Sequence, residues 1–298
     1  GGDINFKRPS QAKEIIRRLK KNKGAMVGLI LLILIILVVI FADVIAPYDA
    51  GVIQVAENKL AGPGTPGHPL GCDSYGRDVL SRLVHGARNS LKVAIIASIT
   101  SCLVGCTLGS IAGYFGGRLD ILIMRIAEIV GGLPFIPFAM ILSAVIGTKL
   151  DPTQRMYLIM VVLGVLSWVP TCRLVRAQIL AQREMEYVTA AKAMGIREVK
   201  IVFKHILPNV VSLLLVSMTL DFATCMLTES TLSYLGFGIP LPTPTWGNLL
   251  TGANNSIVIQ QYWWRWVFPA AIFGMCTICI NLMGDGLRDA VDPKSNGR

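Results

Sequence analysis

Long apolar runs separated by polar stretches dominate the sequence. The first run, residues 24–46, consists largely of Leu, Ile and Val and ends at Pro47. A helix of this length, rising about 1.5 Å per residue, crosses the roughly 30 Å hydrocarbon core of a bilayer. Five further runs predict membrane-spanning helices at 91–114, 121–147, 156–175, 210–235 and 264–287. The pattern therefore predicts an all-α membrane protein with six transmembrane helices.

The third predicted span contains a break. Gly131, Gly132 and Leu133 precede Pro134, and Pro137 follows within one turn. A bilayer tolerates such a break only where neighbouring helices or a water path satisfy the freed backbone groups. We therefore expect this break to face protein or a water-filled path.

Basic residues predict the orientation of the spans, because basic loops stay on the cytoplasmic side. Six spans put both ends of the chain on one side. The N-terminal segment, residues 1–23, carries Lys7, Arg8, Lys13, Arg17, Arg18, Lys20, Lys21 and Lys23. The loop 176–209 would share its side and carries Arg176, Arg183, Lys192, Arg197, Lys200 and Lys204. We expect both of these segments, and the tail 288–298, to be cytoplasmic.

The two long loops on the opposite side differ in composition. Residues 236–263 contain no Lys or Arg. Aromatic residues in or beside this loop are those of an outer interfacial belt, namely Trp246, Tyr262, Trp263, Trp264 and Trp266. The loop 47–90 has balanced charges and a Gly/Pro-rich stretch at 62–67 that predicts irregular structure. Apolar residues at helical spacing predict a short amphipathic helix over 78–86, lying at the outer surface.

Composition supports a membrane protein. The chain has 298 residues, of which 53% are hydrophobic and 15% charged, with a mean hydropathy of +0.59. Soluble domains carry roughly 25% charged residues. The net charge of +10 lies largely beside the apolar runs, which favours membrane orientation over nucleic-acid binding. The first run is too long for a secretory signal peptide.

Seven cysteines favour packing over a disulfide framework. Six of them lie in or beside apolar runs, and Cys72 is placed in the outer loop without an obvious partner. Cys276 and Cys279 form a C-x-x-C pair, but no second pair or His cluster accompanies them. We interpret these cysteines as small packing residues of membrane helices.

The cytoplasmic loop 176–209 is long, polar and rich in helix-forming residues. Residues 184–194 predict one helix, and Gly195 suits the left-handed conformation that ends it. Residues 197–207 predict a second, amphipathic helix, which Pro208 is expected to stop. A helix–hinge–helix unit on this face suits docking to a cytoplasmic partner. The alternative is a surface-lying loop that only connects two spans.

This loop resembles the EAA loop of binding-protein-dependent ABC permeases, whose pattern is E-A-A-x3-G-x9-I-x-L-P. The matching positions are Thr189, Ala190, Ala191, Gly195, His205, Leu207 and Pro208. Thr189 replaces the usual Glu and His205 replaces the usual Ile. Glu186 lies one turn before Thr189 on the same helix face, next to Tyr187, and could supply the carboxylate. The resemblance implies that this loop meets the ATPase subunit.

Further motifs resemble the dipeptide/oligopeptide/nickel branch of these permeases, and its C-type subunit in particular. They are HPLGCDSYGRDVLSR at 68–82, GAR at 86–88, GYFGG at 113–117, MR at 124–125, YLGFG at 234–238, PTWG at 244–247 and NLMGDGLRDAVDP at 281–293. Cys72 stands where Thr is usual. The resemblance covers about Lys20 to Pro293 and implies the type I ABC importer permease fold, with a permease core over 91–287.

The resemblance also implies partners and a mechanism. It implies a second homologous permease subunit, two ABC ATPase subunits that bind ATP and Mg²⁺, and an external solute-binding protein. Transport would proceed by alternating access in a bacterial or archaeal cell membrane. The solute would be a di- or oligopeptide, with nickel or another small solute as the alternative. This sequence contains no G-x-x-x-x-G-K-[ST] motif, so we expect no ATP hydrolysis by this chain.

Charged residues within predicted spans are candidates for the solute path, because burying charge in a bilayer is costly. They are Arg125, Glu128, Asp221 and Glu229. Arg125 and Glu128 are spaced three residues apart, so they could simply pair with each other. Asp221 and Glu229 could instead form hydrogen bonds between helices. His68 and His85 lie apart in the outer region and are weak evidence for a metal site.

Other classes of membrane protein remain as alternatives at this point. An ion-coupled secondary transporter would need no ATPase and often shows inverted repeats, which are not evident between the two halves. A channel is disfavoured because no filter-like loop is evident. An enzyme is disfavoured because no nucleophile–base pair or metal cluster appears. A simple membrane anchor would not need the long loop 176–209.

Overall fold

The computed structural model describes residues 11–53 and 55–292, and every regular element in them is helical, apart from two isolated β-bridges in the loop before α5. Membrane-length helices are α2 (Lys23–Ile40), α5 (Val79–Phe115), α8 (Pro152–Leu166) with α9 (Val169–Gln182), α12 (Leu207–Tyr234) and α15 (Trp264–Val291). A further pair, α6 (Gly117–Gly132) and α7 (Phe135–Ile146), is bent by 80° at the predicted break. Counting the bent pair as one span, the six predicted spans are confirmed.

Short elements connect the long helices. They are α1 (Gln11–Lys21), α3 (Ala42–Ile45), α4 (Val55–Asn58), α10 (Glu186–Ala193), α11 (Glu198–Ile201), α13 (Trp246–Leu249) and α14 (Ser256–Gln261). Two 3₁₀ turns cover Gly147–Lys149 and Leu250–Asn254, and a π-helical turn covers Val202–Ile206.

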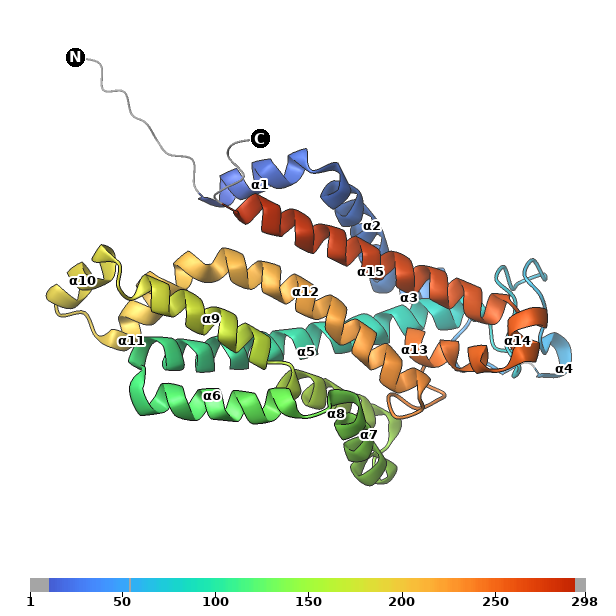
Figure 1. Cartoon of the computed structure of the whole chain (residues 1–298). Helices are drawn as coiled ribbons and strands as arrows, with labels where there is room; N and C mark the ends of the chain where they lie inside the picture. Colours follow the sequence, from blue (N-terminus) through green and yellow to red (C-terminus); the bar gives the residue numbers. More distant parts are fainter. Residues whose placement is uncertain (1–10, 54, 293–298) are drawn as a thin grey trace, which may run out of the picture.

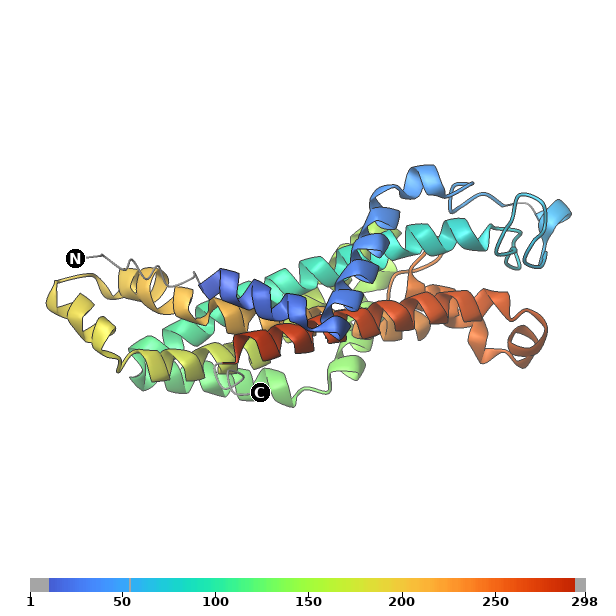
Figure 2. The ribbon, with the colours of Figure 1, turned by 90° about the horizontal axis from the view of Figure 1, so that it is seen from above.

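The long helices form an elongated bundle with two different ends. One end holds α10, and the other holds α4, α13 and α14 (Figure 1). The view from above shows the same separation (Figure 2). The Arg18 guanidinium of α1 donates to the carbonyls of Ala290 and Asp292, both at 3.2 Å. The two ends of the described chain therefore meet near the α10 half of the bundle, as an even number of spans requires.

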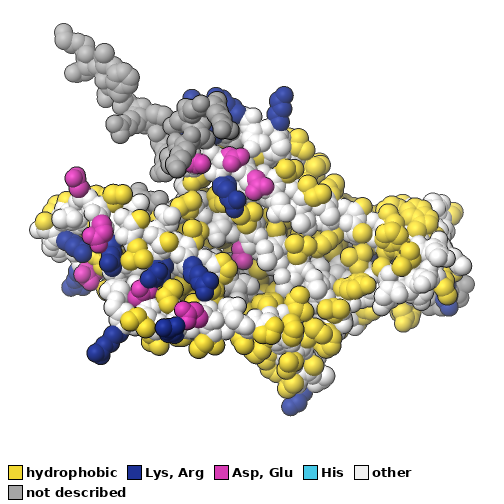
Figure 3. Space-filling model, in the orientation of Figure 1, with side chains coloured by type: hydrophobic (Ala, Val, Ile, Leu, Met, Phe, Trp, Pro, Cys, Tyr) yellow, Lys and Arg dark blue, Asp and Glu magenta, His cyan; other side chains and the backbone are white. Residues whose placement is uncertain are grey.

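Charged side chains follow the same division. On the face shown in Figure 3, Lys, Arg, Asp and Glu gather over the half that holds α10, whereas apolar side chains cover much of the rest. The basic residues Lys7 and Arg8 of the predicted N-terminal segment, and the tail after residue 292, lie outside the described residues.

A ridge of glycines brings α5 and α9 into close contact. Gly105, Gly109 and Gly113 lie four residues apart on one face of α5. A Cβ atom on Gly109 would lie 2.5 Å from the carbonyl oxygen of Cys172, which is closer than atoms can pack. Small residues at this spacing are typical of tightly packed membrane helices. Near the same contact, Arg176 of α9 donates two hydrogen bonds of 2.6 and 2.7 Å to the carboxylate of Asp120 in α6.

The predicted amphipathic surface helix at 78–86 is wrong as a separate element. These residues begin α5, which continues without interruption to Phe115. Asp78 caps the helix by accepting a 2.9 Å hydrogen bond from the Ser81 N–H. Val84 and Ala87 are buried, and the Trp246 indole of α13 covers this turn and donates to the Leu83 carbonyl at 3.2 Å. The buried apolar residues of this turn are thus covered by the chain itself, in part by α13.

The predicted stop at Pro208 is also wrong. The chain stays helical from Glu198 through the π-helical turn Val202–Ile206 into α12, with Pro208 in the first turn of α12. Proline removes the N–H that would bond to the carbonyl four residues earlier. A wider π turn changes the bonding partners at this point, so the helix can continue past the proline.

A buried polar network fixes the outer loop. His68 Nδ1 lies 2.9 Å from Asp78 Oδ1, and its Nε2 lies 3.2 Å from the amide nitrogen of Asn58. Tyr48 stacks on the His68 ring at 4.9 Å. The nearby Cys72 is fully buried, and burial raises the pKa of its thiol to about 11, so the unreactive protonated form persists at neutral pH. His68 thus has a structural place in this loop.

Candidate coupling surface and transport path

Helix α10 has one buried and one exposed face. Val188 and Ala191 are buried, whereas Glu186, Thr189 and Ala190 are exposed. Glu186 and Thr189 share the exposed face, as their spacing predicts. Of the two alanines in the EAA-like pattern, only Ala190 is therefore available to a partner, because Ala191 is buried within the chain.

The glycine after α10 ends the helix as predicted. Gly195 has φ of +74°, the left-handed conformation that glycine adopts without strain. Its N–H donates to the Lys192 carbonyl at 2.9 Å, and the Ile196 N–H donates to the Ala191 carbonyl at 3.2 Å. These two hydrogen bonds form a Schellman turn, which satisfies the last carbonyls of α10.

One apolar cluster joins α10 to the long helices. Its buried members are Tyr114, Val175, Ile179, Val188, Ala191, Ile201, Val202 and Ile206. Tyr187 and Leu207 pack against the cluster from its edge. The Tyr187 hydroxyl also donates to Gln182 Oε1 at 2.5 Å, and the Lys192 ammonium lies 5.4 Å from the centre of the Tyr114 ring. The cluster therefore packs α10 against residues of α5 and α9 and against the π turn that leads into α12, and packed side chains of this kind resist compression.

Exposed apolar side chains lie at both ends of α10 and on the segment that follows it. Met194 is 72% exposed and Phe203 is 61% exposed, and Met185 and Val199 are exposed as well. A concentration of exposed apolar side chains among polar ones is typical of a protein interaction site. We define the docking face as Met185, Glu186, Thr189, Ala190, Met194, Val199 and Phe203. His205 is half-buried and lies outside it.

The docking face was only partly predictable. The sequence indicated Glu186, Thr189 and Ala190 through the helix pattern, but Met185 and Met194 were read only as helix formers. Their signal was available, since one methionine precedes the helix Glu186–Ala193 and another follows it. The two faces of 197–207 could not be told apart from the sequence, because both Ile201 and Phe203 are apolar and only the structure shows which is buried.

The predicted path residue pair on α6 binds to itself. Arg125 Nη1 lies 2.7 Å from Glu128 Oε2, and both side chains are exposed on the bundle surface. Arg125 and Glu128 thus neutralise each other's charge, as the expectation of a self-pair predicted, and their geometry gives no support to a place on the solute path.

The two acidic residues of α12 have different surroundings. Glu229 is fully buried, and its Oε1 accepts a 2.6 Å hydrogen bond from the Ser233 hydroxyl. This environment favours hydrogen bonding within the outer end of the bundle over lining a path. Asp221 is half-buried, and its Oδ2 has no hydrogen-bond partner among the described residues.

A hydroxyl-bearing stripe follows the C-terminal half of α12 and was missed from the sequence. Thr224, Thr228 and Thr231 lie at helical spacing, and each donates to the carbonyl four residues earlier at 2.8 to 3.2 Å. Thr224, Thr231 and Tyr234 are exposed. A lipid-facing surface would be apolar, so this stripe is suited to a water-accessible path. The spacing of the threonines was its signal.

The sequence of this chain matches a known family of membrane proteins. Residues 105–297 match the model of the binding-protein-dependent transport system inner membrane component. The chain belongs to this permease family. Residues 10–63 of this permease also match the N-terminal transmembrane domain of oligopeptide transport permease C. The family resemblance in the sequence, including the C-type motifs, is thereby confirmed.

Three relatives match the permease over nearly its whole length. The dipeptide transport system permease protein DppC of Bacillus subtilis (strain 168) is 38% identical, covering 97% of this chain and 88% of the relative. The oligopeptide transport system permease protein OppC of the same strain is 36% identical, covering 98% and 92%. The di/tripeptide transport system permease protein DppC of Pseudomonas aeruginosa (strain UCBPP-PA14) is 36% identical, covering 96% and 93%.

Proposed function

We propose that this permease is one of two transmembrane subunits of an ATP-driven importer for di- or oligopeptides. The observation that carries the proposal is the docking face, an exposed apolar and acidic surface on a helix that ends in a Schellman turn. Membership in the family supports the importer class, and the names of the three relatives support a peptide solute. ATP and Mg²⁺ would be bound by partner ATPase subunits.

The proposed assembly contains two related permease subunits, two ATPase subunits and an external solute-binding protein. The α10 end of the bundle would be cytoplasmic, because the basic loop 176–209 and the basic helix α1 lie there. The end with α4, α13 and α14 would face the solute-binding protein. Both ends of the chain are then cytoplasmic.

The proposed mechanism is alternating access driven through α10. ATP binding brings the two ATPase subunits together and displaces the docking face. The apolar cluster around Val188 and Ala191 passes the displacement to α5, α9 and α12. Helix packing has discrete arrangements, so a shift of α10 re-tilts the long helices instead of being absorbed locally.

We place the solute path along the exposed hydroxyl stripe of α12, between this permease and its partner subunit. Thr224, Thr231 and Tyr234 would offer hydrogen-bonding groups to peptide amides without binding one side chain strongly. Asp221, with one oxygen lacking a protein partner, is retained as a residue at the edge of the path. Glu229, Arg125 and Glu128 are assigned to structural roles on their geometry.

The test compares two exposed apolar side chains at opposite ends of the bundle. Phe203 of the docking face is 61% exposed, and Ile53 of the outer loop is 60% exposed. We expect Phe203→Glu to abolish co-purification of the ATPase subunits and ATP-dependent peptide uptake into proteoliposomes. Ile53→Glu should leave the ATPase bound. An unchanged ATPase content in Phe203→Glu, or a wild-type preparation without any ATP-hydrolysing partner, would refute the proposal.

A further inference from the structure

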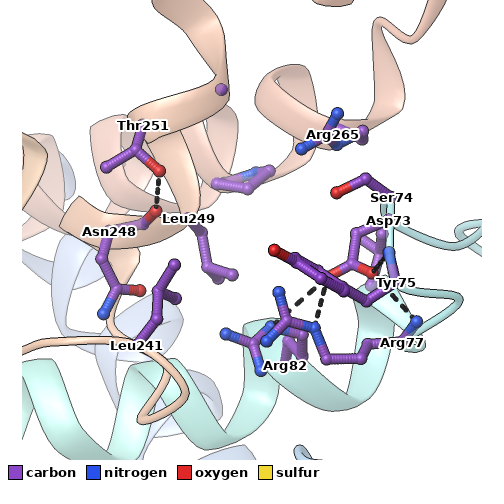
Figure 4. A pocket seen from close by; sticks show the side chains of 13 residues that line it. Asp73, Ser74, Tyr75, Arg77, Arg82, Leu241, Asn248, Leu249, Thr251 and Arg265 are labelled. Atoms are coloured by element: carbon purple, nitrogen blue, oxygen red, sulfur yellow. Dashed lines mark hydrogen bonds and ion pairs between the residues drawn. The ribbon is translucent and has the colours of Figure 1, made fainter. Parts of the chain in front are cut away.

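A small cavity lies at the outer end of the bundle, far from α10. It has a volume of about 90 Å³. Its walls come from the loop before α5, the first turn of α5, the region from α13 to the following 3₁₀ turn, and the start of α15. Figure 4 shows Tyr75, Arg77, Arg82 and Arg265 on one side and Leu249 and Asn248 on the other, around a common hollow.

The cavity carries excess positive charge. Three arginines line it, namely Arg77, Arg82 and Arg265, and Asp73 is the one acidic lining residue, so the formal charge is 3 − 1 = +2. Asp73 is already engaged, because its Oδ2 accepts a 2.7 Å hydrogen bond from Arg77 Nε and its Oδ1 accepts from the N–H groups of Tyr75 and Arg77. This single carboxylate cannot compensate all three guanidinium groups.

The most buried of the three arginines is incompletely satisfied. Arg82 is 1% exposed, and its Nη1 donates to the carbonyls of Ala50 and Pro242 at 2.8 and 3.2 Å. Its Nε lies 3.9 Å from Asp73 Oδ2, beyond hydrogen-bond distance. Neither Nε nor Nη2 has a hydrogen-bond partner in the part of the chain that the structure describes. A buried guanidinium is costly unless its donors are paired, so this arrangement calls for an anion.

Arg265 adds a second group with unused donors. It lies in the first turn of α15, where its backbone N–H donates to the Tyr262 carbonyl at 3.1 Å. Its guanidinium lines the cavity and makes no hydrogen bond or ion pair with residues 11–53 or 55–292. The neighbouring Asn248 amide is satisfied, since its Nδ2 donates to the carbonyls of Ile239 and Thr243. The unused charged donors of the cavity are those of arginine, whose planar fork matches a carboxylate.

The size and position of the cavity limit the ligand. Pockets for whole small molecules usually occupy about 300 to 1,000 Å³, so this cavity suits a single carboxylate group. None of its lining residues belongs to α12, along which the proposed solute path runs. The cavity is therefore suited to a carboxylate of a molecule that docks at this end of the bundle and does not enter the solute path along α12.

We propose that this cavity, the arginine pocket formed by Arg77, Arg82 and Arg265, receives the carboxylate of one Asp or Glu side chain of the solute-binding protein. The inference rests on the proposed importer function. Charge complementarity of this kind sets the orientation of docking and raises its rate, while loss of one partner weakens the complex. The pocket would thus align the binding protein over the permease.

The experiment measures binding of the solute-binding protein to the complete transporter in nanodiscs. Arg265→Gln and Arg77→Gln should each raise the dissociation constant about tenfold or more, with a larger effect at low salt. Peptide uptake should recover at saturating binding protein. Arg88→Gln is the matched control, because Arg88 lies at the same end and pairs with Asp43 but does not line the pocket. It should leave docking unchanged.

A double-mutant cycle identifies the source of the carboxylate. Neutralising one acidic residue of the binding protein should weaken docking as Arg265→Gln does, and the two changes together should cost no more than either alone. Unchanged docking in both arginine variants, or no acidic residue that couples to them, overturns the inference. Another outcome would assign the pocket to the solute and would also overturn the inference. In that outcome, docking weakens to the same extent when the peptide carries an amidated C-terminus, and it does not change when acidic residues of the binding protein are neutralised. A wild-type transporter that binds no solute-binding protein would instead refute the proposed function.

Discussion

The two ends of the bundle are constructed in opposite ways. At the outer end, buried polar groups tie the loop before α5 to the helix itself, through His68, Asp78 and Ser81. At the α10 end, α10 is held mainly by an apolar cluster and a glycine turn, and most of its residues are exposed. Dense buried hydrogen bonding rigidifies a structure, whereas few buried contacts leave an element free to move. The end with α4, α13 and α14 is thus the more constrained of the two, and the α10 end is suited to the lever movement that the proposed mechanism requires.

The largest expected effect is a loss of stability when the buried hydrogen-bond network around Asp78 is removed. Asp78→Ala removes the cap of α5 and leaves the buried side chains of His68 and Ser81 without their acceptor. Losing a helix cap and several buried hydrogen bonds should lower the free energy of unfolding by about 3–5 kcal/mol. The measurement is thermal unfolding of the purified transporter in detergent, together with the yield of inserted protein.

Asp43→Ala is the control for this prediction. Asp43 is an acidic residue of the same end, but it is exposed and forms a 3.3 Å ion pair with Arg88. Exposed ion pairs contribute about 0–1 kcal/mol. If both variants lose the same stability, the outer end does not depend on its buried network and the comparison between the two ends fails.

The contrast between the ends also explains what the sequence could and could not predict. Six spans, the break near Pro134 and the helix ended by Gly195 follow from local periodicity and from the special conformations of glycine and proline. The surroundings of residues 78–86 depend on Trp246, which is far away in the sequence, so the apolar face there was misread as a membrane surface. The arginine pocket likewise joins Arg77 to Arg265, and no local pattern reveals such a pairing.

The charged path candidates show the same limit. Spacing alone predicted that Arg125 could pair with Glu128, because both lie on one helix. The burial of Glu229 could not be predicted, since it depends on the turn after α12 folding back over its own helix. The candidate path instead follows neutral threonines, which carry no charge to mark them in an apolar run.

A smaller effect is expected from overpacking the cluster that holds the lever. Ala191 is buried in the same apolar cluster as Ile179 and Ile201, so Ala191→Leu should destabilise the packing of α10 by about 1–3 kcal/mol. Uptake should fall while the ATPase subunits stay folded. Hydrogen exchange of the α10 amides in the assembled transporter measures the local loss.

The adjacent alanine provides the matched variant. Ala190 is exposed on the docking face, so Ala190→Leu should change stability by no more than about 0.5 kcal/mol. It should nevertheless reduce the affinity of the ATPase subunits, because the added side chain lies where the partner is proposed to pack. If Ala191→Leu and Ala190→Leu had the same effect on hydrogen exchange in α10 and on ATPase binding, α10 would not have distinct buried and exposed faces.

The smallest expected effect concerns the turn at the end of the lever. Gly195 has φ of +74°, and a Cβ added there would meet no atom within 4 Å, so Gly195→Ala tests backbone conformation alone. The left-handed conformation costs a non-glycine residue about 1–2 kcal/mol. We expect faster hydrogen exchange at the last turn of α10 and a weaker coupling of ATP hydrolysis to uptake, with the thermal midpoint almost unchanged. Gly132→Ala, at a position equally open but without a positive φ, should show neither change. If Gly195→Ala leaves exchange in α10 unaltered, the Schellman turn does not hold the helix, and the apolar cluster alone must position the docking face.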